Sequence, residues 1–283
     1  TRTTAEFDTD LSGGRYIVRG EAVGGRRAGR NGSVVDHIRE LAGINHRVRF
    51  ESENDFPTKI GFGSSSSGFA AAAVAVVGAA GLDLTLPEIS AIARRGSSSA
   101  ARAVTGAFSH LRTGLDDVDC RSERIETGLE ADLRIVAAEI PAFKHTEEAH
   151  KEAAESHMFE ARMAHIHEQI ATMRNALREE DFYRAFELAE HDSLSLAATT
   201  MTGPAGWVYW KPETLSVFEI VRTLRDEGVP VYFSTDTGAS VYVNTTAAHV
   251  DHVEAEIADL GIGTRVWEVG GPAEILDEDD ALF

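Results

Sequence analysis

A run of glycines and serines that leads into an alanine-rich stretch constrains the fold of this chain more than any other feature. It lies between Asn54 and Phe69, and its centre, Gly61 to Gly68, holds four consecutive serines; we call this centre the first serine segment. A glycine turn at the start of a helix presents backbone N–H donors and the positive end of the helix dipole, which together bind anions such as phosphate. The local pattern fits a serine-rich N-cap on a core helix equally well.

Composition predicts a globular chain of one large or two modest domains. The 283 residues are 43% hydrophobic, and no apolar run is long enough to cross a bilayer. No signal peptide is visible at Thr1, and the lone Cys120 has no second cysteine for an intrachain disulfide. We therefore expect the chain in the reducing cytoplasm.

The charge is strongly negative. Asp and Glu number 46 against 27 Lys and Arg, a net charge of -19, and few of the basic residues are lysine. Such a surface is typical of halophilic proteins, because concentrated salt screens the repulsion between carboxylates. An acidic tail or a cation-binding protein is the alternative, but the acids are spread along the chain. The negative electrostatic potential of such a surface repels nucleic acid and anionic membranes, so we exclude both as partners.

The expected elements make an α+β chain. In the first part we expect strands at residues 15–20 and 47–53 and helices at residues 33–41, 68–80 and 86–95. Further on we expect strands at residues 133–139, 229–234, 240–243 and 264–269, and helices at residues 149–178, 182–198, 213–227 and 248–260. This second pattern resembles a split βαβ arrangement. We expect domains at residues 1–130 and 131–283, with a solvated acidic tail at residues 277–280.

A second segment repeats the pattern of glycine and hydroxyl groups before a helix. It comprises Gly96 to Ser99, and we call it the second serine segment. Arg102 follows it and adds a guanidinium, which pairs with carboxylate and phosphate oxygens. Two such segments in one domain favour anion binding over two simple helix caps.

A third signal is the turn from Thr235 to Ser240, which places Asp236 between two apolar strands. Taken alone, this turn fits an ordinary hairpin better than a functional site. Together with Arg102 and the two serine segments, it supplies what phosphoryl transfer to an alcohol requires. These requirements are a phosphate cradle, a cation and a proton acceptor.

In their order along the chain, these residues resemble the diphosphomevalonate decarboxylase family of the GHMP kinase superfamily. The resemblance covers almost the whole chain. The stretch from Asn54 to Phe69 resembles the family's nucleotide loop, and residues 93–102 resemble its substrate loop. The further matches are Ser156, Arg162, Asp192, Ser193 and residues 235–238.

The resemblance implies a two-domain GHMP kinase-like fold. Its N-terminal part would resemble domain 2 of ribosomal protein S5, and its C-terminal part would be ferredoxin-like. The implied activity is an ATP-dependent decarboxylation in the mevalonate pathway, in which the C3 hydroxyl of a phosphorylated mevalonate is phosphorylated before phosphate and carbon dioxide are lost. The implied cofactors are ATP and Mg2+, and the implied assembly is a homodimer.

The resemblance also implies a role for each candidate residue. Asp236 would face the C3 hydroxyl as a base or orienting group, and Arg102 would bind the substrate carboxylate, a bidentate task that lysine cannot copy. The ATP phosphates would be bound by Lys59, Gly61, Gly63, Ser64, Ser65 and Ser66, with Ser65 also facing the metal. The substrate would be held by Arg30, Ser97, Ser98, Ser99, Arg102 and Ser156. Exposed positions for Arg30 and Lys59, and a helix-face hydroxyl for Ser156, are the alternatives.

Two departures from the family pattern affect the interpretation. The family has a lysine-containing segment near its start that this chain, which opens at Thr1, does not contain; we expect that a native N-terminal stretch precedes Thr1. The other departure is Glu147 and Glu148, which stand where the family has small polar residues near the terminal phosphate of the substrate. Carboxylates repel a diphosphate more than a monophosphate.

The sequence therefore favours mevalonate 5-phosphate as the substrate and isopentenyl phosphate as the product. Three alternatives stay open. The first is the diphosphomevalonate decarboxylase that makes isopentenyl diphosphate. The second is a kinase of the same superfamily that stops at the 3-phosphate, and the third is a relative that only binds nucleotide.

Overall fold

The structure, a computed structural model, describes residues 1–283 except 12, 19, 23–24, 57–62 and 142–145. The side chains of residues 25–28 and 146–148 also lie outside the description. The chain forms two compact units, the first comprising Thr1–Ile125 with Gly270–Phe283 and the second comprising Glu126–Val269. Each unit combines helices with a sheet, as the predicted α+β class requires.

A four-stranded sheet in the order β1-β4-β2-β3 forms one layer of the first unit. Its strands are β1 (Arg2–Asp8), β2 (Arg15–Val18), β3 (Glu21–Ala22) and β4 (Arg47–Glu53). β4 runs antiparallel to β1 and parallel to β2. Alternate residues of β4, Val48, Phe50 and Ser52, are buried, as a strand with one face on a core requires.

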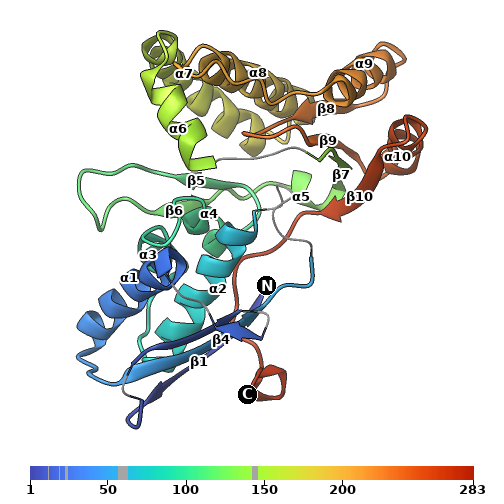
Figure 1. Cartoon of the computed structure of the whole chain (residues 1–283). Coiled ribbons are helices and arrows are strands. Elements are labelled where there is room, and N and C mark those ends of the chain that lie inside the picture. Colours follow the sequence, from blue (N-terminus) through green and yellow to red (C-terminus); the bar gives the residue numbers. More distant parts are fainter. Residues whose placement is uncertain (12, 19, 23–24, 57–62, 142–145) are drawn as a thin grey trace. The chain divides into compact units, whose positions relative to one another are not determined.

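Helices cover one face of this sheet (Figure 1). They are α1 (Gly25–Ala42), α2 (Ser64–Ala79), α3 (Leu86–Ala93) and α4 (Ala100–Thr105). α2 contacts β1, α1, α3 and α4. Its sequence after Phe69 is almost entirely Ala and Val, and residues such as Ala73 and Val76 are fully buried. The short side chains of α2 let its neighbours approach closely. A small hairpin of β5 (Ser109–Leu111) and β6 (Ser122–Arg124) follows α4.

The C-terminal residues 270–283 pack on the first unit, whereas we expected them in the second domain. The Ala107 N–H donates to the Gly270 carbonyl at 3.0 Å. Asp280 pairs with Arg2 of β1 at 3.3 Å, and it is the last residue of a short 3-10 turn, Glu278–Asp280. The acidic residues that we expected in a solvated tail are exposed, but Asp280 pairs with Arg2, and the Leu282 N–H just after them donates to the Thr4 hydroxyl of β1 at 2.9 Å.

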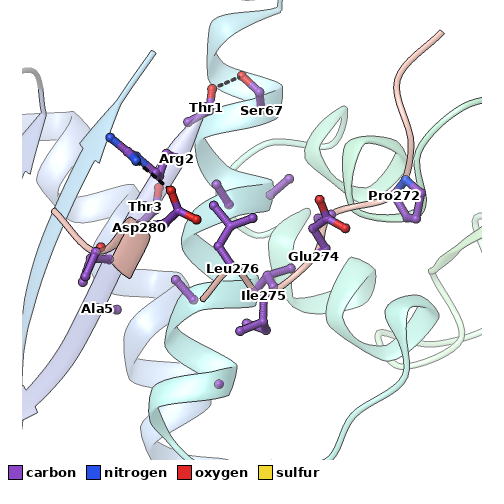
Figure 2. A pocket seen from close by; sticks show the side chains of 18 of the residues that line it. Thr1, Arg2, Thr3, Ala5, Ser67, Pro272, Glu274, Ile275, Leu276 and Asp280 are labelled. Carbon is purple, nitrogen blue, oxygen red and sulfur yellow. Dashed lines mark hydrogen bonds and ion pairs between the residues drawn. The ribbon is translucent and has the colours of Figure 1, made fainter. Parts of the chain in front are cut away.

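One glycine allows the C-terminal segment, residues 270–283, to pack on the first unit. Gly106 has a φ of 70°, a left-handed conformation that favours glycine, and a Cβ built on it would lie 2.2 Å from the carbonyl oxygen of Gly271. The C-terminal segment therefore passes directly over the end of α4. Between α2, β1 and this segment lies a cavity of about 730 Å3 (Figure 2). Thr1 lies at one end of the cavity, where its hydroxyl donates to the Ser67 hydroxyl at 2.8 Å.

The second unit contains an antiparallel sheet in the order β10-β7-β9-β8. Its strands are β7 (Leu133–Glu139), β8 (Val231–Ser234), β9 (Val241–Thr246) and β10 (Gly263–Glu268). β8 and β9 form the predicted hairpin, with Ser234 opposite Tyr242. The predicted positions of all four strands are close to those observed.

Helices pack on both faces of this second sheet. α9 (Pro212–Asp226) and α10 (Val250–Ala258) pack on one face, where Phe218 of α9 stacks on Phe233 with ring centroids 3.9 Å apart. α8 (Phe182–Met201) lies against β8, and Phe182 contacts the Tyr232 ring. Tyr232 and Phe233 are consecutive in β8 and point to opposite faces. α6 (Thr146–Glu155) and α7 (Phe159–Arg178) lie beside α8 (Figure 1), and the short α5 (Leu129–Asp132) precedes β7.

The long helix expected at residues 149–178 is broken in the structure. α6 ends at Glu155 and α7 begins at Phe159. Ser156 lies in the break, where its hydroxyl accepts a hydrogen bond from the Met158 N–H at 3.0 Å and contacts the Thr202 hydroxyl at 2.7 Å. Serine side chains that bond to nearby backbone compete with the helix, and this competition is invisible to hydrophobic periodicity.

Among the residues that the structure describes, no helix combines the length and the hydrophobicity that a membrane span requires.

A buried ion pair joins α8 to α9 and β8. The Glu190 carboxylate accepts from the Arg225 guanidinium at 2.6 Å and from the Phe233 N–H at 3.1 Å. The Glu190 side chain is 7% exposed and the Arg225 side chain 30%. A buried charge with several donors is costly to remove, because its partners lose their acceptor.

Replacing Glu190 with alanine should lower the free energy of unfolding of the second unit by about 3 kcal/mol, because the Arg225 charge and the Phe233 N–H would lose their acceptor. Urea unfolding followed by intrinsic fluorescence would measure this loss. All the tryptophans, Trp207, Trp210 and Trp267, lie in the second unit and report its unfolding.

The matched control is Glu187→Ala, on the same helix. Glu187 pairs with Arg184 at 3.0 Å, but both side chains are about half exposed, so this change should cost less than about 1 kcal/mol. Equal losses in the two variants would contradict a stabilising role for the buried pair.

Candidate active site

The serines of the first serine segment form the N-terminal turn of α2. We expected the helix to begin at Gly68, but it begins at Ser64. Gly63 precedes it with a φ of 66°, and its carbonyl accepts from the N–H groups of Ser66 and Ser67 at 2.8 and 3.2 Å. The first N–H groups of a helix have no acceptor within the helix, so this turn presents donors to an anion.

The hydroxyls of this turn differ in exposure. Ser65 is exposed, whereas Ser64 and Ser66 are half-buried. An exposed hydroxyl oxygen is a ligand type that Mg2+ accepts, so Ser65 fits the predicted metal contact in chemical type. Lys59 and Gly61, which we also predicted to bind ATP, lie outside the described residues.

The second serine segment lies next to this turn. Ser99 is joined to Ser66 by a short contact between their hydroxyls, and it also contacts the Ser97 hydroxyl at 3.1 Å. Ser98 is exposed. The structure therefore brings together residues of the predicted ATP-binding and substrate-binding sets that are about thirty positions apart in the sequence.

The two residues before the second serine segment hold the backbone in place where the segment begins. Arg94 and Arg95 both pair with the Asp117 carboxylate, and the Arg94 Nε donates to the Cys120 carbonyl at 2.8 Å. The hydrogen bond from Arg94, with the positive charges of both arginines, lowers the pKa of Asp117. These two arginines anchor the end of α3 to the loop that precedes β6.

Arg30 makes two contacts with the same region. Its Nε donates to the carbonyl oxygen of Gly96 at 2.6 Å, and its guanidinium carbon lies 4.9 Å from the centroid of the Phe69 ring. Arg102, by contrast, is exposed on α4, and its guanidinium has no ion pair with any residue of the described ranges. An exposed arginine one turn after three serines is suited to bind a carboxylate or a phosphate.

Asp236 belongs to the second unit and lies just after β8. Its carboxylate is exposed, while the neighbouring Thr235 and Thr237 are 9% and 6% exposed. The Thr235 N–H donates to the Ser193 hydroxyl of α8 at 3.0 Å, and this anchors the backbone directly before the aspartate. On the other side of the turn, the Thr214 hydroxyl of α9 donates to the Ala239 carbonyl at 2.8 Å.

Tyr242 of β9 lies close to Asp236. Burial, and secondarily the negative charge of Asp236, raise the pKa of the Tyr242 phenol, so its hydroxyl stays protonated at neutral pH. In the hairpin, Tyr242 lies opposite Ser234. Asp236 follows Ser234 by two residues, so it lies diagonally across from Tyr242 on the same side of the hairpin. We did not single out this tyrosine from the sequence, although the two-residue period of the strands indicates its side.

Arg162 and Asp192, both quoted from the sequence, meet in the second unit. The Arg162 guanidinium of α7 contacts the Asp192 carboxylate of α8 at 2.8 Å. The next residue, Ser193, accepts the hydrogen bond from the Thr235 N–H. α8 therefore contacts α7 through Asp192 and the Asp236 turn through Ser193. Ser156 is 6% exposed and its hydroxyl contacts Thr202 and Met158, so its substrate contact stays a prediction.

No group of three or more His, Cys, Asp or Glu side chains able to hold a metal ion occurs within the described part of the chain. The hydroxyls of Ser64, Ser65 and Ser66 offer oxygen atoms at the predicted nucleotide site. The N–H groups, hydroxyls and guanidinium of the first unit are suited to bind an anion.

Comparisons with known proteins match this arrangement. Residues 1–122 match a family model described as diphosphomevalonate decarboxylase-like N-terminal domain. The chain is 69% identical to the phosphomevalonate decarboxylase of Haloferax volcanii, over 100% of this chain and 88% of that protein.

Solved structures agree over both units. The mevalonate diphosphate decarboxylase of Staphylococcus aureus superposes with a TM-score of 0.92 at 25% identity, covering 97% of this chain and 86% of that chain. A complex of MDDEF with MVAPP, AMPPCP and magnesium superposes with a TM-score of 0.87 at 27% identity, covering 95% of this chain and 84% of that chain. The predicted GHMP kinase-like fold is confirmed. This chain belongs to the diphosphomevalonate decarboxylase family.

Proposed function

We propose that this protein is an ATP-dependent decarboxylase that converts mevalonate 5-phosphate to isopentenyl phosphate in the mevalonate pathway. The observation that carries the proposal is the 69% identity, along the whole chain, with a phosphomevalonate decarboxylase. The exposed Arg102 and the contact between Ser66 and Ser99 support it, because they are suited to hold a carboxylate-bearing substrate beside the phosphates of a nucleotide.

In the proposed first step, Asp236 accepts the proton of the C3 hydroxyl. The hydroxyl oxygen then forms a bond to the γ-phosphorus of ATP, and ADP leaves. Gly63, Ser64, Ser65 and Ser66, with Lys59 and Gly61, bind the ATP phosphates. Mg2+, held with help from the Ser65 hydroxyl, would neutralise charge on those phosphates.

In the proposed second step, the C3–O bond breaks and phosphate leaves. The electrons of the bond between C2 and the carboxylate carbon form the new double bond, and carbon dioxide is released. Arg102 binds the carboxylate until the bond breaks, Ser97, Ser98 and Ser99 hold the substrate oxygens, and Ser156 completes the substrate site.

The diphosphate enzyme is the second candidate function. The family model and the solved structures are named for diphosphomevalonate or mevalonate diphosphate decarboxylases. Against it stand the name of the 69% identical relative and the acidic residues Glu147 and Glu148 at the start of α6.

We also propose that the protein works as a cytoplasmic homodimer at high salt. The net charge of -19 supports the salt requirement, since screening by ions reduces repulsion between carboxylates. The lone cysteine suits a reducing compartment. The family resemblance supports the homodimer.

Replacing Asp236 with asparagine should lower kcat by at least ~10²–10⁴-fold, because the amide cannot accept the hydroxyl proton. Steady-state assays of ADP and carbon dioxide release would measure the loss. Asp259→Asn, a change of the same type at the exposed end of α10, should leave kcat unchanged. Full activity of the Asp236 variant would exclude the carboxylate as the base.

Mevalonate 5-phosphate should give a larger kcat/KM than the 5-diphosphate at high salt. The physical reason is that Glu147 and Glu148 would repel the additional charge of the diphosphate. Parallel assays of carbon dioxide release with the two substrates decide the point. A larger value for the diphosphate would reverse the assignment, and ADP formation without carbon dioxide would identify a kinase.

A further inference from the structure

The second serine segment is attached to α2 at two points on one face of that helix. Ser66 and Phe69 are three residues apart and therefore lie on the same side of α2. The Ser66 hydroxyl contacts Ser99 at the end of the segment, and the Phe69 ring packs against Gly96 at its start. The helix that carries the predicted ATP site thus also fixes both ends of the predicted substrate segment.

The contact at Gly96 leaves no room for a side chain. A Cβ built on Gly96 would lie 2.2 Å from Cδ1, 2.6 Å from Cγ and 2.8 Å from Cε1 of Phe69. Gly96 is buried and Phe69 is 7% exposed, so the ring has no solvent-filled space into which to move. The separation between α2 and the segment is therefore set by direct packing of a ring on a glycine.

Arg30 contacts both members of this pair. Its Nε donates to the Gly96 carbonyl at 2.6 Å, and its guanidinium carbon lies 4.9 Å from the Phe69 ring centroid. The planar guanidinium can hydrogen-bond to the carbonyl while it packs on the ring, a combination that lysine cannot reproduce. Gly96 is held by the ring on one side and by the hydrogen bond at its carbonyl.

We propose that Arg30 and Phe69 are positioning residues that act through Gly96 to set the place of Ser97 and Ser99 relative to the first turn of α2. The inference rests on the proposed function, in which those two places hold the substrate and the ATP phosphates. Transfer between them depends on the distance and alignment of the reacting atoms, and a displacement of about 1 Å costs ~10²-fold in rate.

The test is a pair of compensating substitutions. Gly96→Ala puts a methyl group into the Phe69 ring and should lower kcat/KM for mevalonate 5-phosphate by ~10²-fold. Phe69→Leu removes ring atoms and should lower it by less than about tenfold. In the double variant the methyl group occupies space that the ring has left, so kcat/KM should exceed that of Gly96→Ala by at least about tenfold.

Gly29→Ala is the matched control, because a Cβ at this position of α1 meets no atom within 4 Å. It should leave kcat, KM and the melting temperature close to those of the wild type. A double variant whose loss equals the product of the two single losses would overturn the inference, since independent effects multiply. Circular dichroism of every variant checks that the fold is kept.

Hydrogen exchange supplies a readout that does not depend on catalysis. Amides of residues 96–105 should exchange faster in Gly96→Ala and return toward wild-type rates in the double variant. Unchanged exchange in Gly96→Ala would overturn the inference even if the wild type lacks activity. An inactive wild type that shows the expected exchange pattern would refute only the proposed function.

The role of Arg30 is tested by measuring whether Arg30→Gln changes kcat or KM. If it acts through Gly96, Arg30→Gln should lower kcat at least tenfold, and its effect should shrink in the Gly96→Ala background. If it only binds the substrate phosphate, as the family resemblance implies, KM should rise while kcat stays constant. That second result would remove Arg30 from the positioning role.

Discussion

The short side chains of α2 are the constraint on which the first unit depends. A helix of Ala and Val buries little area per residue, and it compensates by letting β1, α1, α3 and α4 approach it at once. Because so many elements share this one helix, its N-terminal turn has a fixed position relative to the start of α4. In the proposed function, the segments that bind substrate and nucleotide therefore both pack on the same core of the first unit.

The second unit fixes its functional turn in a different way. Asp236 is exposed, but the backbone on each side of its turn is held by hydroxyls, Ser193 of α8 before it and Thr214 of α9 after it. The buried Glu190 holds the β8 backbone at Phe233. A carboxylate on a tightly held turn keeps its direction without being buried.

The sequence predicted the elements whose chemistry is local. The β8–β9 hairpin follows from apolar strands around a glycine-containing turn, and the helix after the first serine segment follows from a run of alanines. The break at Ser156 and the start of α2 at Ser64 were missed, because both depend on hydrogen bonds that periodicity does not encode. The contact of Phe69 with Gly96 was invisible for a further reason: it joins distant parts of the chain, and neither residue is chemically reactive.

The return of residues 270–283 to the first unit has a consequence for the order of folding. On a ribosome, the second unit is complete before the last element of the first unit has been synthesised. The first unit therefore stays incomplete, with the place above Gly106 and beside β1 unfilled, until residues 270–283 have been synthesised. Residues 126–269 can fold first, and the first unit is completed only after them.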